Sequence, residues 1–302
     1  MLQKTYKNGL RLVSEQLPNL RSVCLGIYIP VGAAHESAEE NGMSHLLEHM
    51  VFKGTQKYSA KDIANRMDEV GGVINAYTTR ECTCFYARVE KGELLRAMEI
   101  LTEMAFCASL RKEDMDREKT VIYEEIAMKD DAPDEVAEEN LYAAVFGETG
   151  LGRSILGTKE ILEGVTVSAL RKFYTKHYRP NNIIIAAVGS FEQEVLDDLA
   201  SPFGEGVISE PLYAYPERIY LPRDNTGHML ITRPVEQAYQ FLSFPGLAAG
   251  DPRRFDMAVL NNILGGGLSS HLFQRIREEL GLAYVIQSYH ETYAHCGLLC
   301  LY

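Results

Sequence analysis

Three polar side chains fall within one short apolar stretch, "GMSHLLEHMVFKGT", residues 42–55. His45 and His49 are four residues apart, which places both imidazoles on one face of a helix, and Glu48 lies beside them. Neutral imidazole is a common zinc ligand, and a nearby carboxylate could accept a proton from the attacking water. The order His-x-x-Glu-His is the reverse of the H-E-x-x-H zinc motif. A surface helix with two histidines and an acid is the alternative, because zinc needs a third ligand.

The segments around this motif predict an α+β domain. Apolar and β-branched residues between turn formers predict strands, and apolar residues at helical spacing predict helices. The expected strands are 10–18, 21–36, a strand or hairpin at 73–89, and a buried strand at 181–190. The expected helices are 42–55, 59–72, 93–106, 112–131, 133–146, 168–178 and 192–200. Strands first, helices next and a strand last are typical of an α+β domain rather than of alternating βαβ units.

The second half of the chain resembles the first. "VINAY" at 73–77 matches "VIQSY" at 285–289, each after a helix that ends in glycine, and Cys84 and Cys296 share the same offset of 212. Order, helix ends and strand position together favour a duplicated domain. The second copy would stop at the counterpart of residue 90, which favours a fragment over a naturally short domain.

The fold class expected is therefore α+β, with duplicated domains that each pack a mostly antiparallel sheet against helices, the second domain being truncated. The stretch 201–223 carries four prolines and no sustained periodicity, which is typical of a linker. The predicted limits are 1–212 for an N-terminal catalytic domain, 213–222 for the linker and 223–302 for an incomplete second domain. Within the second domain we expect strands at 228–234, 238–246 and 283–302 and helices at 252–266 and 269–281.

Composition and charge exclude several classes of protein. The net charge of −12, from 30 basic and 42 acidic residues, argues against nucleic acid as a partner, because phosphate binding needs a basic surface. The sequence has no apolar run of membrane-spanning length and no signal-peptide pattern, which predicts a cytoplasmic protein with no membrane partner. Six cysteines without C-x-x-C spacing indicate free thiols in a reducing compartment.

The motif at 42–55 resembles the zinc motif of the pitrilysin/insulinase family of metallopeptidases. It is most similar to the short-chain branch that includes the mitochondrial processing peptidase catalytic subunit and its bacterial homologues. "GGVINAYTTRECTCFY", "YRPNNIIIAAVGSF" and "NNILGGGLSSHLFQRIREELGLAYVIQSY" resemble further family segments in the family's order. The resemblance implies that Glu125, 76 positions after His49, is the third zinc ligand. It also implies that Glu118, seven residues earlier, supports the site and that Glu48 is the general base.

The same resemblance implies two further groups of site residues. Asn75 and Ala76, in "VINAYT", match positions that meet the backbone of an extended peptide bound as an added strand. Arg277 and Tyr284, seven residues apart in "RIREELGLAYVIQSY", match a pair that faces the zinc across a chamber. A guanidinium and a phenol are suitable hydrogen-bond donors for the oxyanion that forms during peptide hydrolysis.

The resemblance thus implies a zinc endopeptidase that holds one Zn²⁺ per chain and cleaves peptides or unfolded polypeptide segments. Family members with short chains complete the chamber by pairing, so a homodimer or a heterodimer with a homologue is expected of the full-length form. A non-catalytic scaffold or assembly subunit, an inactive fragment, and a metal-storage or metal-sensing protein are the alternatives. Intact ligand and base positions favour the enzyme, because inactive relatives usually lose one of them.

Overall fold

The computed structural model describes residues 1–205 and 227–302, and these divide into two compact units. Unit 1 comprises residues 1–126 and 154–205, and unit 2 comprises residues 127–153 and 227–302. The predicted linker, 213–222, lies outside the described residues. The predicted domain limits therefore stay a prediction, whereas the compact units show that residues 127–153 fold with the C-terminal part of the chain.

Unit 1 is built on a six-stranded sheet with the order β1-β2-β6-β3-β5-β4. The strands are β1 (Leu2–Thr5), β2 (Arg11–Gln16), β3 (Ser22–Ile29), β4 (Val73–Thr78), β5 (Thr83–Glu90) and β6 (Ile184–Gly189). Only the pair of β2 and β6 is parallel; the other paired strands are antiparallel. The sheet confirms the α+β prediction and places β4 at one edge, beside the segments that carry the motif.

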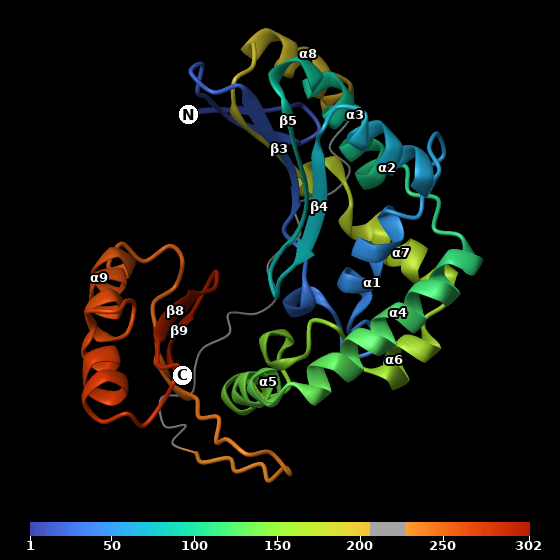
Figure 1. Cartoon of the computed structure of the whole chain (residues 1–302). Coiled ribbons are helices and arrows are strands. Elements are labelled where there is room, and N and C mark those ends of the chain that lie inside the picture. Colours follow the sequence, from blue (N-terminus) through green and yellow to red (C-terminus); the bar gives the residue numbers. More distant parts are fainter. Residues whose placement is uncertain (206–226) are drawn as a thin grey trace. The chain divides into compact units, whose positions relative to one another are not determined.

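Helices cover one face of this sheet, and Figure 1 shows α1, α2 and α7 on the same side of β4. The helices of the chain are α1 (Met43–Val51), α2 (Ala60–Asp68), α3 (Leu94–Phe106), α4 (Lys112–Asp131), α5 (Pro133–Phe146), α6 (Lys159–Gly164), α7 (Val167–His177), α8 (Gln193–Gly204) and α9 (Arg254–Leu264). Alternate residues of β3, such as Leu25 and Ile27, are fully buried beneath the helices with Phe85 of β5. Period-two burial therefore fixes which face of each strand meets the helices.

Unit 2 contains a three-stranded antiparallel sheet with the order β7-β9-β8, formed by Leu242–Pro245, Gly297–Leu301 and Ser288–Thr292. Helix α9 packs on β8. Hydroxyl groups join the sheet to α5: Tyr142 donates to Glu291 at 2.7 Å, and Tyr289 donates to Glu138 at 2.7 Å. These bonds explain why residues 127–153 belong to this unit.

Three predictions for the second half differ from the structure. The single strand expected at 283–302 is two strands, β8 and β9, which pair with each other. The strand expected at 228–234 is wrong, because these residues form no regular element and are exposed. A short run of apolar and β-branched residues is a weak strand signal, because strand formation depends on the packing of neighbouring strands. The helix expected at 269–281 forms, but residues Phe273–Glu279 have the wider π-helical turn.

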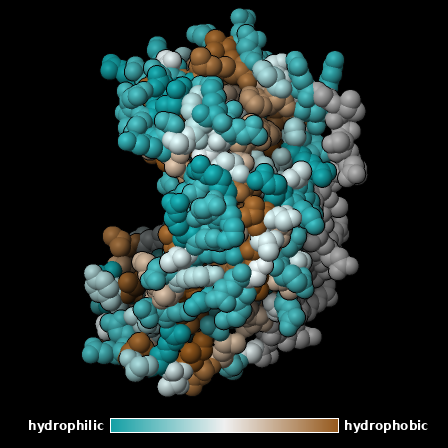
Figure 2. Space-filling view, turned by 90° about the vertical axis from the view of Figure 1, so that its right-hand side faces the viewer, coloured by the Kyte–Doolittle hydropathy of each residue, from teal (hydrophilic) through white to brown (hydrophobic). Residues whose placement is uncertain are grey.

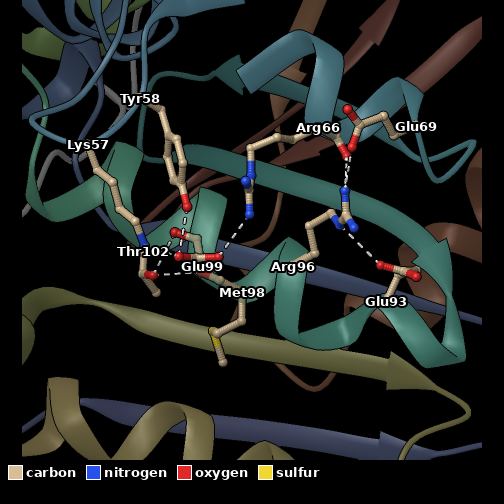
Figure 3. Close-up of polar contacts among 9 residues, drawn as sticks. All are labelled: Lys57, Tyr58, Arg66, Glu69, Glu93, Arg96, Met98, Glu99 and Thr102. Atoms are coloured by element: carbon tan, nitrogen blue, oxygen red, sulfur yellow. Dashed lines mark hydrogen bonds and ion pairs between the residues drawn. The ribbon is translucent and has the colours of Figure 1, made fainter. Parts of the chain in front are cut away.

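Polar contacts hold α2 against α3 (Figure 3). Glu99 of α3 accepts hydrogen bonds from the Tyr58 hydroxyl, at 2.7 Å, and from Lys57. The Arg66 guanidinium of α2 lies over the Tyr58 ring, 4.7 Å from its centroid, and pairs with Glu99 at 3.4 Å. Arg96 of α3 reaches back to α2's C-cap residue and to its own helix. Exposed pairs of this kind contribute about 0 to 1 kcal/mol each.

The face of the molecule drawn in Figure 2 carries mostly hydrophilic side chains, with apolar side chains gathered in separate patches. Within the described ranges, no helix is both long enough and apolar enough to cross a membrane. All six cysteines are free thiols.

Two buried histidines of unit 1 predict how stability depends on pH. Burial lowers the pKa of His35 to about 4 and the pKa of His177 to about 3, and basic residues near His177 add to its shift. In the unfolded chain both titrate near 6.5, so below that pH the unfolded state binds protons that the folded state does not. The contribution of the two neutral histidines to stability is therefore fully present above about pH 6.5 and is lost as the pH falls towards 4. At pH 5 each histidine lowers the free energy of unfolding by about 2 kcal/mol relative to pH 7.

Replacing His177 by glutamine removes one of these two contributions. We expect the loss of unfolding free energy between pH 7 and pH 5 to be smaller in His177→Gln than in the parent by about 2 kcal/mol. Urea unfolding followed by circular dichroism measures it, with a metal chelator present at both pH values. His228→Gln, at an exposed position, is the control. Equal pH dependence of His177→Gln and the parent would contradict the prediction.

Candidate functional site

Helix α1 carries the motif because its two faces differ. Leu46, Leu47 and Met50 are fully buried in the core of unit 1. His45 and His49 lie on the opposite, partly exposed face, as does Glu48. The apolar face thus fixes the rotation of the helix and directs the three polar side chains out of the core.

The N-terminus of α1 is capped by a side chain from the preceding loop. The N-cap residue is Gly42, whose φ of +91° is the left-handed region and which has no side chain to accept a hydrogen bond. Glu36 takes that role: its carboxylate accepts bonds from the backbone N–H of Gly42 at 2.8 Å and of Ser44 at 2.6 Å. Asn41 also donates to Glu36, at 3.1 Å. Burial raises the pKa of Glu36, and these hydrogen bonds oppose that shift. Carboxyl oxygens at this end satisfy free N–H groups, so Glu36 fixes where the motif helix begins.

Replacing Glu36 by glutamine is expected to lower the unfolding free energy by about 2 kcal/mol, because the amide group puts N–H donors where the backbone also donates. Urea unfolding at pH 7 measures the change. Glu40→Gln in the same loop is the matched control, since Glu40 accepts one exposed backbone bond, from Ser37 at 3.1 Å. Similar stability of the two variants would show that Glu36 does not anchor the helix.

Three donor groups from two helices converge beside α1. The Nε2 atoms of His45 and His49 lie 3.7 and 3.6 Å from the two carboxylate oxygens of Glu125 on α4, and the two rings are 4.7 Å apart. One donor atom from each residue lies within 4.8 Å of the others. Ligands around a tetrahedral zinc are separated by about 3.3 to 3.5 Å, because zinc bonds to nitrogen and oxygen are about 2.0 to 2.2 Å long.

The charge state of this group also suits zinc. Burial lowers the pKa of His45 to about 4, and the neighbouring His49 adds to the shift, so the His45 imidazole is neutral at pH 7. Two imidazoles and one carboxylate form the set of three protein ligands that catalytic zinc sites use, with a fourth position left for water or substrate. The residues present therefore fit the metal that the sequence predicts.

Glu48 lies beside this group and is held from β4. Its carboxylate accepts a hydrogen bond from the Thr78 hydroxyl at the end of the strand. Burial raises the pKa of Glu48 above its usual range, an effect that the bonds to Thr78 and the proximity of His49 reduce. A carboxylate with a raised pKa is suited to accept and return a proton near neutral pH. Thr78 was not predicted from the sequence, since a threonine at a strand end has no distinguishing pattern.

Glu118 and Lys53 support His49 from behind. A carboxylate oxygen of Glu118, on α4 and 6% exposed, lies 3.1 Å from Nδ1 of His49. The other oxygen of Glu118 pairs with the Lys53 ammonium at 2.9 Å. With Nδ1 as the donor, His49 presents the lone pair of Nε2 towards Glu125. Glu118 thus lies beside His49, where a supporting carboxylate is expected, and Lys53, which no sequence pattern marks, pairs with it.

The edge of the sheet next to the three converging donor groups is β4. β4 is the last strand in the order, so among the described residues its outer edge pairs with no other strand. The backbone N–H of Ala76 donates to the Asn75 side-chain oxygen at 2.8 Å rather than to a strand. Asn75 and Ala76, the two predicted peptide contacts, therefore lie on an open edge, and a local side chain covers one of its donors.

Both halves of this chain are similar to known proteins. Residues 11–159 match the family model Insulinase (Peptidase family M16), and residues 164–302 match the model Peptidase M16 inactive domain. An uncharacterized zinc protease of Bacillus subtilis is 40% identical over 298 residues, which are 99% of this chain and 72% of that protein. One of Streptomyces coelicolor is 41% identical over 304 residues, 99% of this chain and 66% of that protein. The chain belongs to the M16 peptidase family.

A solved structure with the same fold is a protease from Helicobacter pylori, with a TM-score of 0.89 and 22% sequence identity over 99% of this chain and 73% of that one. The M16 chain thus spans between 66% and 73% of the length of these three proteins. The family predicted from the motif and the α+β fold are confirmed.

The remaining predicted residues of the M16 chain lie in unit 2. Tyr284 is 81% exposed, and the Arg277 guanidinium lies 4.9 Å from the centroid of its ring and 4.7 Å from that of Phe273. Arg277 and Tyr284 are therefore neighbours, as their spacing along the sequence suggests. Their role as donors to the substrate stays a prediction.

Proposed function

We propose that this chain is a zinc-dependent endopeptidase that cleaves peptides or unfolded polypeptide segments. The observation that carries the proposal is the convergence of His45, His49 and Glu125 from two helices, with Glu48 beside them. Relatives that bear the name zinc protease support the same chemistry. One Zn²⁺ per chain follows from the single group of this kind among the described residues.

Each residue of the site has its own role in the proposed reaction. His45, His49 and Glu125 would hold the metal, which would supply Lewis-acid chemistry for the hydrolysis of a peptide bond. Glu48 accepts the proton of the attacking water at its carboxylate and returns it to the amine that leaves. Thr78 orients that carboxylate through its hydrogen bond. Arg277 and Tyr284 are proposed donors to the developing oxyanion.

The substrate is proposed to bind as an added strand on β4. Main-chain hydrogen bonds on an open sheet edge give affinity for any extended segment, and this suits peptides and unfolded chains rather than folded proteins. A peptide that pairs with the Ala76 N–H must displace the Asn75 side chain, which occupies that donor at 2.8 Å. Ala76 is small, which allows the peptide to approach.

The surroundings of the enzyme are also part of the proposal. A homodimer, or a heterodimer with a family homologue, would complete the chamber in the full-length form. The acidic net charge of −12 favours neither nucleic acid nor an anionic membrane as a partner. A cytoplasmic location is proposed because all six cysteines are free thiols, as is usual in a reducing compartment.

A non-catalytic role is the second candidate function, because residues 164–302 match a model described as inactive. One pair of measurements on this chain separates the candidates: bound zinc by elemental analysis, and cleavage of a quenched fluorescent peptide before and after chelation. We expect about one zinc per chain and cleavage that stops on chelation and returns with zinc. Bound zinc without cleavage would favour a scaffold or an inactive fragment, and lack of zinc would contradict the metal centre.

A further inference from the structure

We propose that Lys53 is a positioning residue for the metal centre, acting through Glu118 on the ligand His49. The inference rests on the proposed metal centre and adds a residue to it. Lys53 lies two residues beyond the end of α1, and its ammonium pairs with one carboxylate oxygen of Glu118 at 2.9 Å. The other oxygen of that carboxylate lies 3.1 Å from Nδ1 of His49. The three side chains thus form one continuous path from an ammonium group to an imidazole.

Burial makes the pairing with Lys53 necessary. The Glu118 side chain is 8% exposed, whereas that of Lys53 is 34% exposed, so water reaches the lysine but hardly reaches the carboxylate. A buried carboxylate oxygen without a partner is costly and turns towards any available donor. Lys53 prevents this turn by holding one oxygen, which leaves the other directed at Nδ1 of His49.

The backbone of Lys53 is itself fixed in position. Its N–H donates to the carbonyl of Met50 at 3.1 Å, and its carbonyl accepts a bond from the Arg111 guanidinium at 2.9 Å. The lysine therefore approaches Glu118 from a defined point at the end of the helix that carries His45 and His49. One segment, α1 and the two residues after it, thus supplies the ligands His45 and His49 and also Lys53, which orients the carboxylate that supports His49.

Two effects of opposite sign follow from removing this cation. Loss of a positive charge near the site favours a metal cation through space, whereas loss of carboxylate orientation weakens the hold on His49. We infer that orientation dominates, because partners outside the ligands change metal affinity by about 10- to 100-fold in known sites. We therefore expect Lys53→Met to bind zinc about 10-fold more weakly, at the low end of that range.

The test uses the zinc-loaded full chain and two readouts that do not depend on catalysis. Zinc affinity is measured by competition with a chromophoric chelator, and the visible absorption spectrum of the cobalt-substituted chain reports ligand geometry. We expect Lys53→Met to bind zinc more weakly and to alter the cobalt spectrum, and Lys53→Arg to restore both. Lys57→Met is the matched control, because Lys57 lies in the same segment but pairs with Glu99.

A double-mutant cycle isolates the path through the carboxylate. In a Glu118→Gln background, Lys53→Met should change zinc affinity by less than about 2-fold, since the group through which it acts has lost its charge. Zinc binding by Lys53→Met that equals or exceeds that of the parent would overturn the inference and leave the metal centre intact. A parent chain that binds no zinc would overturn the proposed function as well. Lys53→Ala, which also removes the donor, replaces the methionine variant if that variant does not fold.

Discussion

Replacing Glu48 by glutamine is expected to lower peptide cleavage by about 10³-fold, a loss of about 4 kcal/mol of transition-state stabilisation, while the chain keeps its metal. Glutamine has nearly the shape of glutamate and can still contact Thr78, but it cannot accept the proton of the attacking water. Glu48 is not among the three converging donors, so zinc content should stay at the parent value. Initial rates on a quenched fluorescent peptide and elemental analysis of the same preparation measure both quantities.

Glu90→Gln provides the matched control for this experiment. Glu90 ends β5 in the same unit and is exposed, so its replacement should change neither the rate nor the metal content. Cleavage by Glu48→Gln at the parent rate would exclude Glu48 as the base. Loss of zinc from Glu48→Gln would show instead that this carboxylate helps to hold the metal.

Replacing Glu125 by alanine is expected to weaken zinc binding by more than about 100-fold, because even the partners of ligands contribute about 10- to 100-fold. Glu125 is the only donor of the group that α4 supplies, and both histidines lie within 3.7 Å of its carboxylate. Without it, two imidazoles on one helix remain, and these make a weak site that zinc leaves readily. Cleavage should disappear together with the metal.

The neighbouring Glu124→Ala is the control for this variant. Glu124 is exposed on α4 and belongs to no group of converging donors in the described part of the chain. The two variants remove the same charge from the same helix, so a difference in zinc affinity reports the ligand and not the net charge. Zinc dissociation constants from chelator competition measure it, and equal values for both variants would contradict the assignment of Glu125.

The sequence predicted most local elements of unit 1, because each of these has its own signal, but it did not predict β1 or α6. The helix expected at 112–131 is α4 with the same limits, and the strand or hairpin at 73–89 is the pair of β4 and β5. Hydrophobic periodicity and the residues typical of helix ends are local features of the sequence. They therefore predict an element without knowledge of its tertiary contacts. The pairing of β2 with β6 could not be predicted, because it joins segments about 170 residues apart and no local pattern encodes such a contact.

In the candidate site, too, local features were predictable from the sequence and long-range contacts were not. His45, Glu48 and His49 were predicted from spacing on one helix, whereas Glu125 needed the resemblance to a family, since its 76-residue separation from His49 has no periodicity. Lys53 lies four residues after His49, but its role could not be predicted, because a lysine near a helix end is usually a solvated charge. Only the three-dimensional structure shows that the Lys53 ammonium pairs with the buried carboxylate of Glu118 on α4.

The open edge of β4 has a consequence for the behaviour of the protein in solution. A strand with unpaired backbone groups pairs with any exposed strand that it meets, including the same strand of another molecule, and such pairing starts aggregation. Val73 and Tyr77 on this strand are 46% and 41% exposed, and β4 has no charged residue to discourage the contact. Asn75 covers the Ala76 N–H from within its own chain. The side chain that the proposed substrate would displace therefore also protects the free protein against association with itself.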